Sequence, residues 1–155
     1  MLTTEDGKHF AQSWAILRYL GRRFGYYSED PETAWRIDST IDAVDDFFTS
    51  YFKVHFEADE AKREAAKISF LTDVLPKWLL AIEKRLKNNV TPNYIVGESM
   101  TIADFTLATA SFNVLFNEGN PYFKDFAPIL SHHETFKAYA NNLKHELSEH
   151  LANRN

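Results

Sequence analysis

"GESMTIADFTLA", residues 97–108, decides where an internal helix of this chain begins. Thr101 is a good N-cap residue, and the carboxylate of Asp104, three positions later, can accept a hydrogen bond from the backbone N–H of Thr101. Met100 and Phe105 occupy the two positions whose side chains pack together across a helix start. The stretch therefore predicts a capping box and a hydrophobic staple. Loss of either polar partner is expected to lower the free energy of unfolding by about 1–2 kcal/mol.

Helical spacing continues downstream of this start. The helix is expected to run to Leu115 and to stop before the breaker at residues 119–121. A short helix is expected over residues 123–130, and a last helix from about residue 133 to residue 151. The apolar face of the last helix comprises Phe136, Tyr139, Leu143 and Leu147.

Upstream, Asp30 and Pro31 predict the start of a long helix. Aspartate can cap the helix, and proline at the first position lacks an N–H that would have no partner there. Apolar residues then recur three or four positions apart, which predicts a face packed on another helix. That face comprises Ile37, Ile41, Val44, Phe48 and Tyr51.

A third helix is expected after a charged, alanine-rich stretch at residues 59–67. Its apolar face comprises Ile68, Leu71, Leu75, Trp78, Ile82 and Leu86. Pro76 lies inside this helix and removes a backbone hydrogen bond, so it predicts a kink or a local break.

The N-terminal residues predict a hairpin followed by a helix. The Asp6-Gly7 pair lies between two short extended pieces, as in tight hairpin turns, where glycine tolerates a positive φ. A helix is expected from Ser13, a plausible N-cap residue, to Gly25. Because two strands are marginal alone, the hairpin is expected to belong to a larger sheet. The predicted fold class is an all-α bundle preceded by a short β-hairpin and a helix.

Composition narrows the class of protein. At 155 residues with 45% hydrophobic content, the chain can build one well-buried core. A net charge of −5 provides no broad attraction to nucleic acid or to anionic membranes. The absence of cysteine excludes disulfides and thiolate metal sites within these residues. No apolar run approaches the roughly 18 residues of a membrane span, and no leader pattern is visible, so a cytoplasmic location is expected.

Gln12 and Ser13 are the first candidate binding residues. The start of a helix presents unpaired N–H groups beside the positive end of the helix dipole, so it can bind a carboxylate. A serine hydroxyl and a glutamine amide there can hold both ends of an α-amino acid group. The alternative is that Ser13 simply caps its own helix.

Four aspartates along one strip of the long helix form the second candidate: Asp38, Asp42, Asp45 and Asp46. Like charges at this spacing repel, although the helix dipole compensates part of the cost. The functional interpretation is that one or two of them face an ammonium group, a cation or a basic partner. The six histidines form no HxxxH or HxH pair with nearby acids, so no metal site is expected. His132 and His133 are adjacent and would diverge by roughly 100° on a helix.

Three stretches together resemble the cytosolic glutathione transferase family, especially its sigma and mu-like branches. They match in order and spacing: "DGKHFAQSWAILRYLGRRFG" at 6–25, "RIDSTIDAVDDFF" at 36–48 and "YIVGESMTIADFTLA" at 94–108. The resemblance implies that residues 1–28 are the remnant of a thioredoxin-like domain and that residues 29–155 are the family's all-helical domain. Everything before the third strand of the thioredoxin-like domain is absent from these residues.

The resemblance also implies roles for individual residues. Gln12 and Ser13 match the pair that binds the γ-glutamyl end of glutathione, the expected co-substrate. Asp46, and next to it Asp45, match an acid that reaches the glutathione amino group from the partner subunit. The resemblance places Phe48, Tyr51 and Phe52 in the electrophile pocket. It assigns Thr101 and Asp104 to the structural capping box. No residue is assigned as catalytic, because the family's catalytic tyrosine or serine lies in the missing part.

The implied function is a glutathione transferase that, when complete, conjugates or isomerises a small hydrophobic electrophile with glutathione. This chain alone is expected to be inactive, and to act as a homodimer or with a partner chain that supplies the N-terminal half. One alternative is a non-catalytic helical interaction module in a larger assembly. The other is a stand-alone binder of small ligands that uses the helical pocket.

Overall fold

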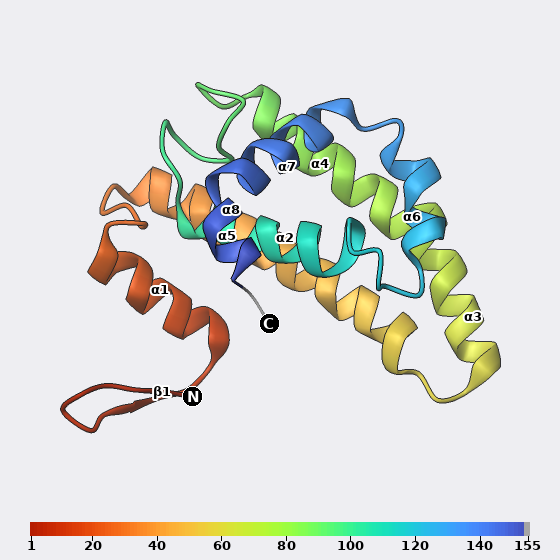
Figure 1. Cartoon of the computed structure of the whole chain (residues 1–155), viewed down its shortest axis with the longest axis horizontal. Helices are drawn as coiled ribbons and strands as arrows, with labels where there is room; N and C mark the ends of the chain where they lie inside the picture. Colours follow the sequence, from red (N-terminus) through yellow and green to blue (C-terminus); the bar gives the residue numbers. More distant parts are fainter. Residues whose placement is uncertain (154–155) are drawn as a thin grey trace.

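The computed structural model describes residues 1–153 and is mainly helical (Figure 1). The elements, in chain order, are β1 Leu2–Thr3, β2 His9–Phe10, α1 Ser13–Phe24, α2 Pro31–Phe56, α3 Glu60–Ser69, the π-helical turn η1 Phe70–Val74, α4 Leu75–Lys87, α5 Ile102–Ala110, the π-helical turn η2 Ser111–Leu115, α6 Phe123–Leu130, α7 Glu134–Glu146 and α8 Ser148–Ala152. The predicted fold class, a helical bundle after a short hairpin, is confirmed.

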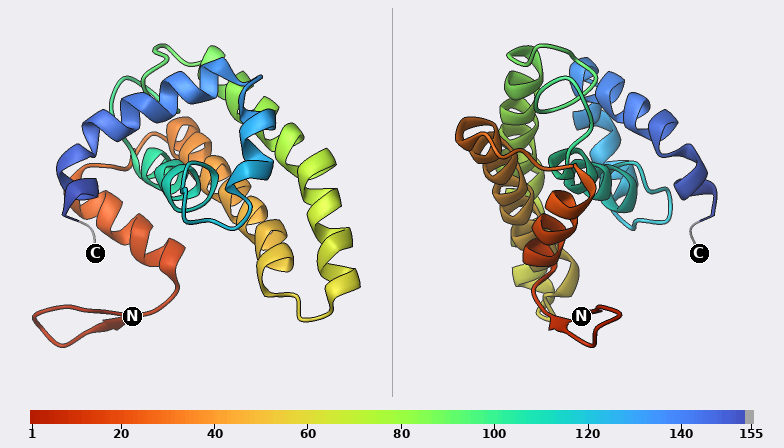
Figure 2. Two further views of the ribbon diagram at one scale, coloured as in Figure 1. Left: turned by 45° about the vertical axis from the view of Figure 1, so that its right-hand side comes forward. Right: turned by 90° about the vertical axis from the view of Figure 1, so that its left-hand side faces the viewer.

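The hairpin projects from the helical bundle in every view, and α1 links it to the bundle (Figures 1 and 2). Strand β1 pairs with β2 in antiparallel register, with Leu2 opposite Phe10 and Thr3 opposite His9, which confirms the expected hairpin. The ring of Phe10 stacks on that of Tyr19 in α1, with 4.8 Å between centroids. The sheet has two strands among the described residues, so its outer edges carry no strand partner there.

Helix α1 contacts α5 through its buried glycine. A Cβ atom on Gly21 would lie 2.7 Å from Cγ2 of Ile102, so no other residue fits unless the Ile102 side chain shifts. The backbone N–H of Ile102 donates to the carbonyl oxygen of Tyr26 at 2.9 Å, just beyond α1. The Tyr26 ring meets Phe105 edge-on at 5.1 Å between centroids. These contacts fix α1 to the helix that the capping box starts.

Helix α2 begins as expected, with the Asp30 carboxylate accepting from Thr33 N–H at 2.8 Å. The expected core position at Phe48 is wrong, because Phe47 is the buried residue at 1% exposure. The Phe47 ring lies 4.7 Å from that of Trp78 and 5.5 Å from that of Phe70. Phe48, one residue further and about 100° around the helix, is only partly buried, and its ring meets the edge of this aromatic cluster at Phe47, with 5.5 Å between centroids.

The third helix starts earlier than expected. Asp59 caps α3 by accepting from Lys62 N–H at 3.0 Å, so the charged stretch is itself helical. Ile68, expected in the core, is 54% exposed, and Phe70 is buried instead. The turn η1, which ends two residues before Pro76, shifts the apolar face by adding one residue to a turn of the helix. The irregularity expected near Pro76 takes the form of this π-helical turn, and the backbone stays helical at Ser69 and Leu75 on either side of it.

The capping box at the start of α5 is present. Thr101 N–H donates to Asp104 Oδ2 at 2.8 Å, and Ala103 N–H donates to the Thr101 hydroxyl at 3.3 Å. Asp104 is fully buried and also accepts from the backbone N–H of Ile95 and the hydroxyl of Tyr139, at 2.9 and 2.8 Å. One carboxylate therefore joins the start of α5, the preceding loop and α7.

The last expected helix is divided in two. The backbone of Leu147, at φ −98° and ψ 12°, leaves α geometry and separates α7 from α8. At the start of α7, buried His133 places Nδ1 3.1 Å from Oε2 of buried Glu83 on α4. The other Glu83 oxygen accepts from Phe136 N–H at 3.1 Å, so a side chain of α4 anchors α7. His132 is exposed.

Candidate functional site

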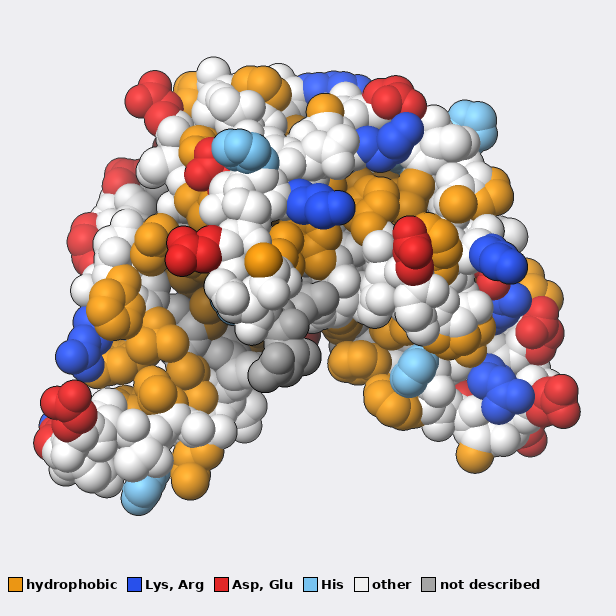
Figure 3. All heavy atoms as spheres, viewed as in Figure 1, with side chains coloured by type: hydrophobic (Ala, Val, Ile, Leu, Met, Phe, Trp, Pro, Cys, Tyr) orange, Lys and Arg blue, Asp and Glu red, His pale blue; other side chains and the backbone are white. Residues whose placement is uncertain are grey.

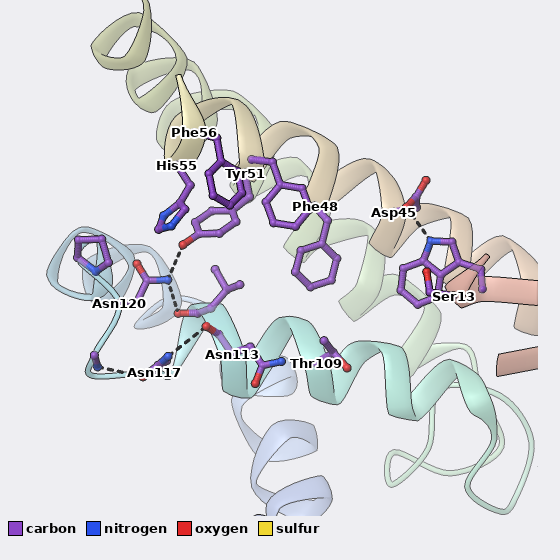
Figure 4. A pocket seen from close by; sticks show the side chains of 15 residues that line it. Ser13, Asp45, Phe48, Tyr51, His55, Phe56, Thr109, Asn113, Asn117 and Asn120 are labelled. Carbon is purple, nitrogen blue, oxygen red and sulfur yellow. Dashed lines mark hydrogen bonds between the residues drawn. The ribbon is translucent and has the colours of Figure 1, made fainter. Parts of the chain in front are cut away.

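A cavity of about 620 Å³ lies between α1, the C-terminal half of α2, and the α5–η2 segment with its following loop (Figure 4). Figure 3 shows the molecule as an arch, with hydrophobic side chains bordering the hollow between the hairpin arm and the α2–α3 turn. The cavity residues are Ser13, Trp14, Asp45, Phe48, Tyr51, Phe52, His55, Phe56, Thr109, Asn113, Val114, Asn117, Gly119, Asn120 and Pro121. A cavity of this size suits a small organic molecule.

The α2 wall of the cavity is aromatic. Phe48, Phe52 and Phe56 lie four residues apart and so share one helix face. Their successive ring centroids are 5.6 and 5.5 Å apart, and Phe52 and Phe56 are 46% and 72% exposed. The His55 ring stacks on Tyr51 at 5.7 Å. The wall therefore offers flat apolar surface and one imidazole to a bound molecule.

The opposite wall carries asparagines from η2 and the loop after it. Asn120 is buried: its Nδ2 donates to the Tyr51 hydroxyl at 2.8 Å, and its Oδ1 accepts from Tyr122 N–H at 2.9 Å. Asn117 Oδ1 accepts from Gly119 N–H at 2.9 Å. These amides fix the loop in place, and the loop closes one end of the cavity.

Tyr51 supplies a buried hydroxyl to this region. Burial raises the pKa of Tyr51, although the hydrogen bond from Asn120 acts in the opposite direction. The phenol is therefore neutral at physiological pH. It packs against Phe47 and Phe70 and joins the aromatic wall to the loop.

At the α1 end of the cavity, the backbone before the helix is strained. Gln12 has φ 70° and ψ 107°, and among residues 1–153 it is the sole non-glycine with positive φ. The expected N-cap at Ser13 is wrong: Gln12 is the N-cap, Ser13 is the first helical residue, and no side chain caps the helix. The strained turn redirects the chain so that Ser13 already has helical geometry. Strain of this kind concentrates at functional sites, and the first-turn N–H groups stay free for a ligand.

The aspartate strip of α2 faces α1. Asp38 accepts from Arg18 Nε at 2.7 Å and from the Tyr27 hydroxyl at 2.6 Å. Asp45 accepts from Trp14 Nε1 at 2.7 Å, which brings it to the cavity beside Ser13. Asp46 is exposed and is not a cavity residue. Side chains of α1 thus compensate part of the negative charge of these aspartates.

The Arg18–Asp38 pair predicts a modest loss of stability in acid. Burial alone would raise the pKa of Asp38, but hydrogen bonds from Arg18 and Tyr27 outweigh burial and lower it. A lowered folded-state pKa gives stability that is present above the unfolded pKa of about 3.9 and is lost as pH falls through the folded value. Because both side chains are about one-third exposed (30% and 35%), the effect should stay below about 1 kcal/mol.

Denaturant unfolding at pH 7 and at pH 3 checks this expectation. Arg18→Gln should lower the free energy of unfolding at pH 7. At pH 3 the free energies of unfolding of the variant and the parent protein should differ less. A difference that is the same at both pH values would contradict a charge-dependent contribution of Arg18.

The structure brings some of the expected site residues together and leaves others apart. Ser13, Asp45, Phe48, Tyr51 and Phe52 all line the cavity, whereas Gln12 and Asp46 do not. Sequence reasoning missed Trp14, His55, Phe56 and the asparagine wall. The spacing of Phe48, Phe52 and Phe56 was a usable signal for the first wall, since three phenylalanines four residues apart form a stripe. No local signal marked the asparagines, which lie over 50 residues further along the chain.

Two kinds of feature are absent from residues 1–153. No group of three or more His, Asp or Glu side chains is arranged to hold a metal ion there. No helix in that range is both long enough and apolar enough to cross a membrane.

Comparisons with known proteins define the class. Residues 45–149 match the family model described as "Glutathione S-transferase, C-terminal domain". The chain is 36% identical over 101 residues to glutathione S-transferase 2 of Manduca sexta, covering 64% of this chain and 48% of the relative. It is 31% identical over 109 residues to glutathione S-transferase A of Cavia porcellus, covering 70% and 49%. The chain therefore belongs to the glutathione S-transferase family and spans about half the length of these relatives.

Solved structures agree with this fold. Na-GST-3, a glutathione S-transferase of Necator americanus, superposes with a TM-score of 0.78 at 26% identity, covering 97% of this chain and 71% of that one. A structure of prostaglandin synthase D of Nilaparvata lugens gives a TM-score of 0.79 at 23% identity, with 97% and 71% covered, and supports the fold alone. S-crystallin SL11 of Nototodarus sloanii is 29% identical over 110 residues, covering 70% of this chain and 53% of the relative.

Proposed function

We propose that this chain is the helical part of a cytoplasmic glutathione transferase that conjugates or isomerises a small hydrophobic electrophile with glutathione. In this proposal residues 1–28 belong to a thioredoxin-like domain and residues 29–155 form the helical domain. The rest of the thioredoxin-like domain comes from the same gene product or from a partner chain, and the assembly is a dimer. The domain supplies the hydroxyl that stabilises the glutathione thiolate, so residues 1–155 alone do not catalyse the reaction.

One observation carries the proposal: a strained, uncapped helix start opens beside a cavity with an aromatic wall. Ser13 lines the cavity, and the adjacent Gln12 holds the positive φ. A carboxylate suits the free N–H groups and dipole of α1, while an apolar, flat molecule suits Phe48 and Phe52. Family membership supports assigning these two subsites to glutathione and to the electrophile.

The residues of this chain would act by binding and orientation. Gln12 and Ser13 would hold the α-amino acid end of glutathione, and Asp46 or Asp45 of the partner subunit would pair with its ammonium group. Asp45 already accepts from Trp14, so Asp46, which is exposed and makes no ion pair among the described residues, is the better candidate. The aromatic wall would hold the electrophile in line with the thiolate, a gain in proximity that lowers the barrier.

Glutathione binding tests the assignment of Gln12 and Ser13. In a chain extended by a tyrosine-bearing βαβ segment, replacing both residues by alanine should weaken glutathione affinity at least about tenfold, since hydrogen bonds to charged groups contribute about 1.5–3 kcal/mol each. Isothermal titration calorimetry measures the change. Thr109→Ala, a cavity residue on the opposite wall, is the matched control and should bind glutathione normally. Unchanged affinity in the double mutant would show that the γ-glutamyl assignment is wrong.

Activity gives a separate test. Residues 1–155 alone should not conjugate glutathione to a chloronitrobenzene above the solvent rate, whereas the extended chain should. Turnover by the short chain, abolished by a substitution within it, would contradict the proposed need for an external hydroxyl.

A helical interaction module is the second candidate. Exposed apolar side chains favour it, among them Phe24 at 64% and Leu80 at 60% exposure. Under this alternative, glutathione would not bind to the extended chain, and a substitution such as Leu80→Asp would abolish association with a partner protein.

A further inference from the structure

A second, much smaller cavity lies where α2, α4 and the segment before α5 meet. Its volume is about 120 Å³, which suits a group of a few atoms and is below the usual range for drug-sized ligands. Its residues are Trp35, Arg36, Ser39, Thr40, Arg85, Ile95 and Val96, and none of them lines the aromatic cavity. Two arginines therefore line one small cavity.

Neutral oxygen atoms hold the Arg85 guanidinium in position. Arg85 Nη1 donates to the Thr40 hydroxyl at 2.8 Å and, more weakly, to the Ser39 hydroxyl at 3.5 Å. Both hydroxyls donate their own protons to the carbonyl oxygen of Arg36, at 2.9 and 3.2 Å, and so present lone pairs to Arg85. These contacts use one nitrogen of the guanidinium, whose remaining N–H groups have no acceptor among residues 1–153.

The charge of Arg85 has no counterion among residues 1–153. Within the part of the chain that the structure describes, no carboxylate lies within ion-pair distance of Arg85 or Arg36, although both side chains are half-buried. Burial alone lowers the pKa of Arg85, yet an arginine side chain stays protonated. By contrast, half-buried Arg18 contacts two aspartates. A partly desolvated charge without a partner is unfavourable unless something else compensates it.

Arg36 is also preorganised. Its Nη2 donates to Asn89 Oδ1 at 3.3 Å, and the same oxygen accepts from Gly97 N–H at 2.9 Å. Asn89 Nδ2 donates to the carbonyl oxygens of Tyr94 and Gly97, both at 2.8 Å. Asn89 thereby joins the loop that carries Ile95 and Val96 to α2, so hydrogen bonds hold this wall of the cavity.

We propose that this cavity is a binding site for an oxyanion, the phosphate or carboxylate group of a ligand, held by Arg36 and Arg85. Such a group provides both the acceptor atoms and the negative charge that the two guanidinium groups lack, and arginine is well suited to bind it through paired N–H donors. The site shares no residue with the proposed glutathione site and does not depend on it.

Titration of the chain with inorganic phosphate, at fixed pH and ionic strength, tests the proposal by ¹H–¹⁵N nuclear magnetic resonance. We expect saturable shifts at the Thr40 and Val96 amides and at the Trp35 indole. Arg85→Gln should weaken phosphate binding at least about tenfold, because a charge-assisted hydrogen bond is lost. Shifts that stay linear in phosphate, or that are equal in the parent protein and Arg85→Gln, would overturn the proposal.

Arg63→Gln is the matched control. Arg63 is also half-buried and makes one hydrogen bond to a neutral acceptor, from Nη1 to the carbonyl oxygen of Glu57 at 3.2 Å, but it lies outside the cavity. Its replacement should leave phosphate binding unchanged, and an equal loss would overturn the proposal. If circular dichroism shows that Arg85→Gln does not fold, Arg36→Gln takes its place with the same expected result.

Two further measurements identify the source of the anion. Acetate in place of phosphate tests whether a lone carboxylate is sufficient. Sedimentation with and without phosphate distinguishes a free anion from a carboxylate of a second copy. If phosphate dissociates a dimer, and if the substitution Arg85→Gln dissociates it without phosphate, the anion is a carboxylate of a second copy. Saturable phosphate binding at constant mass supports a free anion. Both results support an oxyanion site.

Discussion

Replacement of Asp104 by alanine is expected to lower the free energy of unfolding by about 4 kcal/mol, more than a helix cap alone contributes. The carboxylate is fully buried and accepts from three separate parts of the chain: Thr101 N–H, Ile95 N–H and the Tyr139 hydroxyl. Alanine would leave these buried donors without an acceptor, at a cost of about 1–3 kcal/mol each. Since the free energy of unfolding of a native protein is about 5–15 kcal/mol, this loss is a large fraction of the total stability.

Urea unfolding followed by circular dichroism measures this effect. Thr101→Ala is the matched control, because it removes the cap from the same helix start; of the hydrogen bonds to Asp104 it removes only that from the Thr101 hydroxyl, at 3.2 Å, and it should cost about 1 kcal/mol. Tyr139→Phe removes one donor and should fall between the two. Equal losses for Asp104→Ala and Thr101→Ala would mean that Asp104 acts as a cap alone.

Replacement of Phe47 by alanine should cost about 3–5 kcal/mol, the usual range for a buried phenylalanine. Its ring packs between Trp78 and Phe70 and is 1% exposed, so its removal leaves a cavity in the core. The neighbouring Phe48→Ala should cost about 1 kcal/mol or less, because that ring is partly exposed and lines an existing cavity.

Thermal or urea unfolding of both variants gives the comparison, with helicity checked by circular dichroism. The two substitutions remove the same atoms from adjacent positions of one helix, so helix propensity cancels. If Phe48→Ala were as destabilising as Phe47→Ala, the sequence-based assignment of Phe48 to the core would be correct and the packing described above would be wrong.

Signals confined to a few residues predicted the fold best. Asp30 and Thr101 both cap helices where the sequence places them, because a cap forms between groups two or three residues apart. The hairpin at Asp6-Gly7 formed for a similar local reason. The choice between Phe47 and Phe48 was not local, since both are large and apolar, and the position of Phe70 and Trp78 decides which of them is buried.

In the candidate site, too, the sequence indicated the types of residue and the fold decided their contacts. The types of residue at Gln12-Ser13 indicated ligand binding, but the positive φ of Gln12 and the missing side-chain cap are visible only in the folded chain. The aspartate strip suggested an external cation, and the structure instead supplies Arg18 for Asp38 and Trp14 for Asp45 from α1. Contacts of this kind join residues 20 to 31 positions apart and have no periodic signature.

The sequence by itself determined that this protein is a helical bundle after a hairpin, where most helices start, and to which family it is similar, because caps, turns and periodicity are local properties of the chain. The tertiary structure alone decided which phenylalanine enters the core, which aspartates have partners, and that Arg36 and Arg85 line one cavity with no counterion in the described part of the chain. The physical reason is that burial and charge compensation depend on neighbours that folding brings from distant parts of the chain.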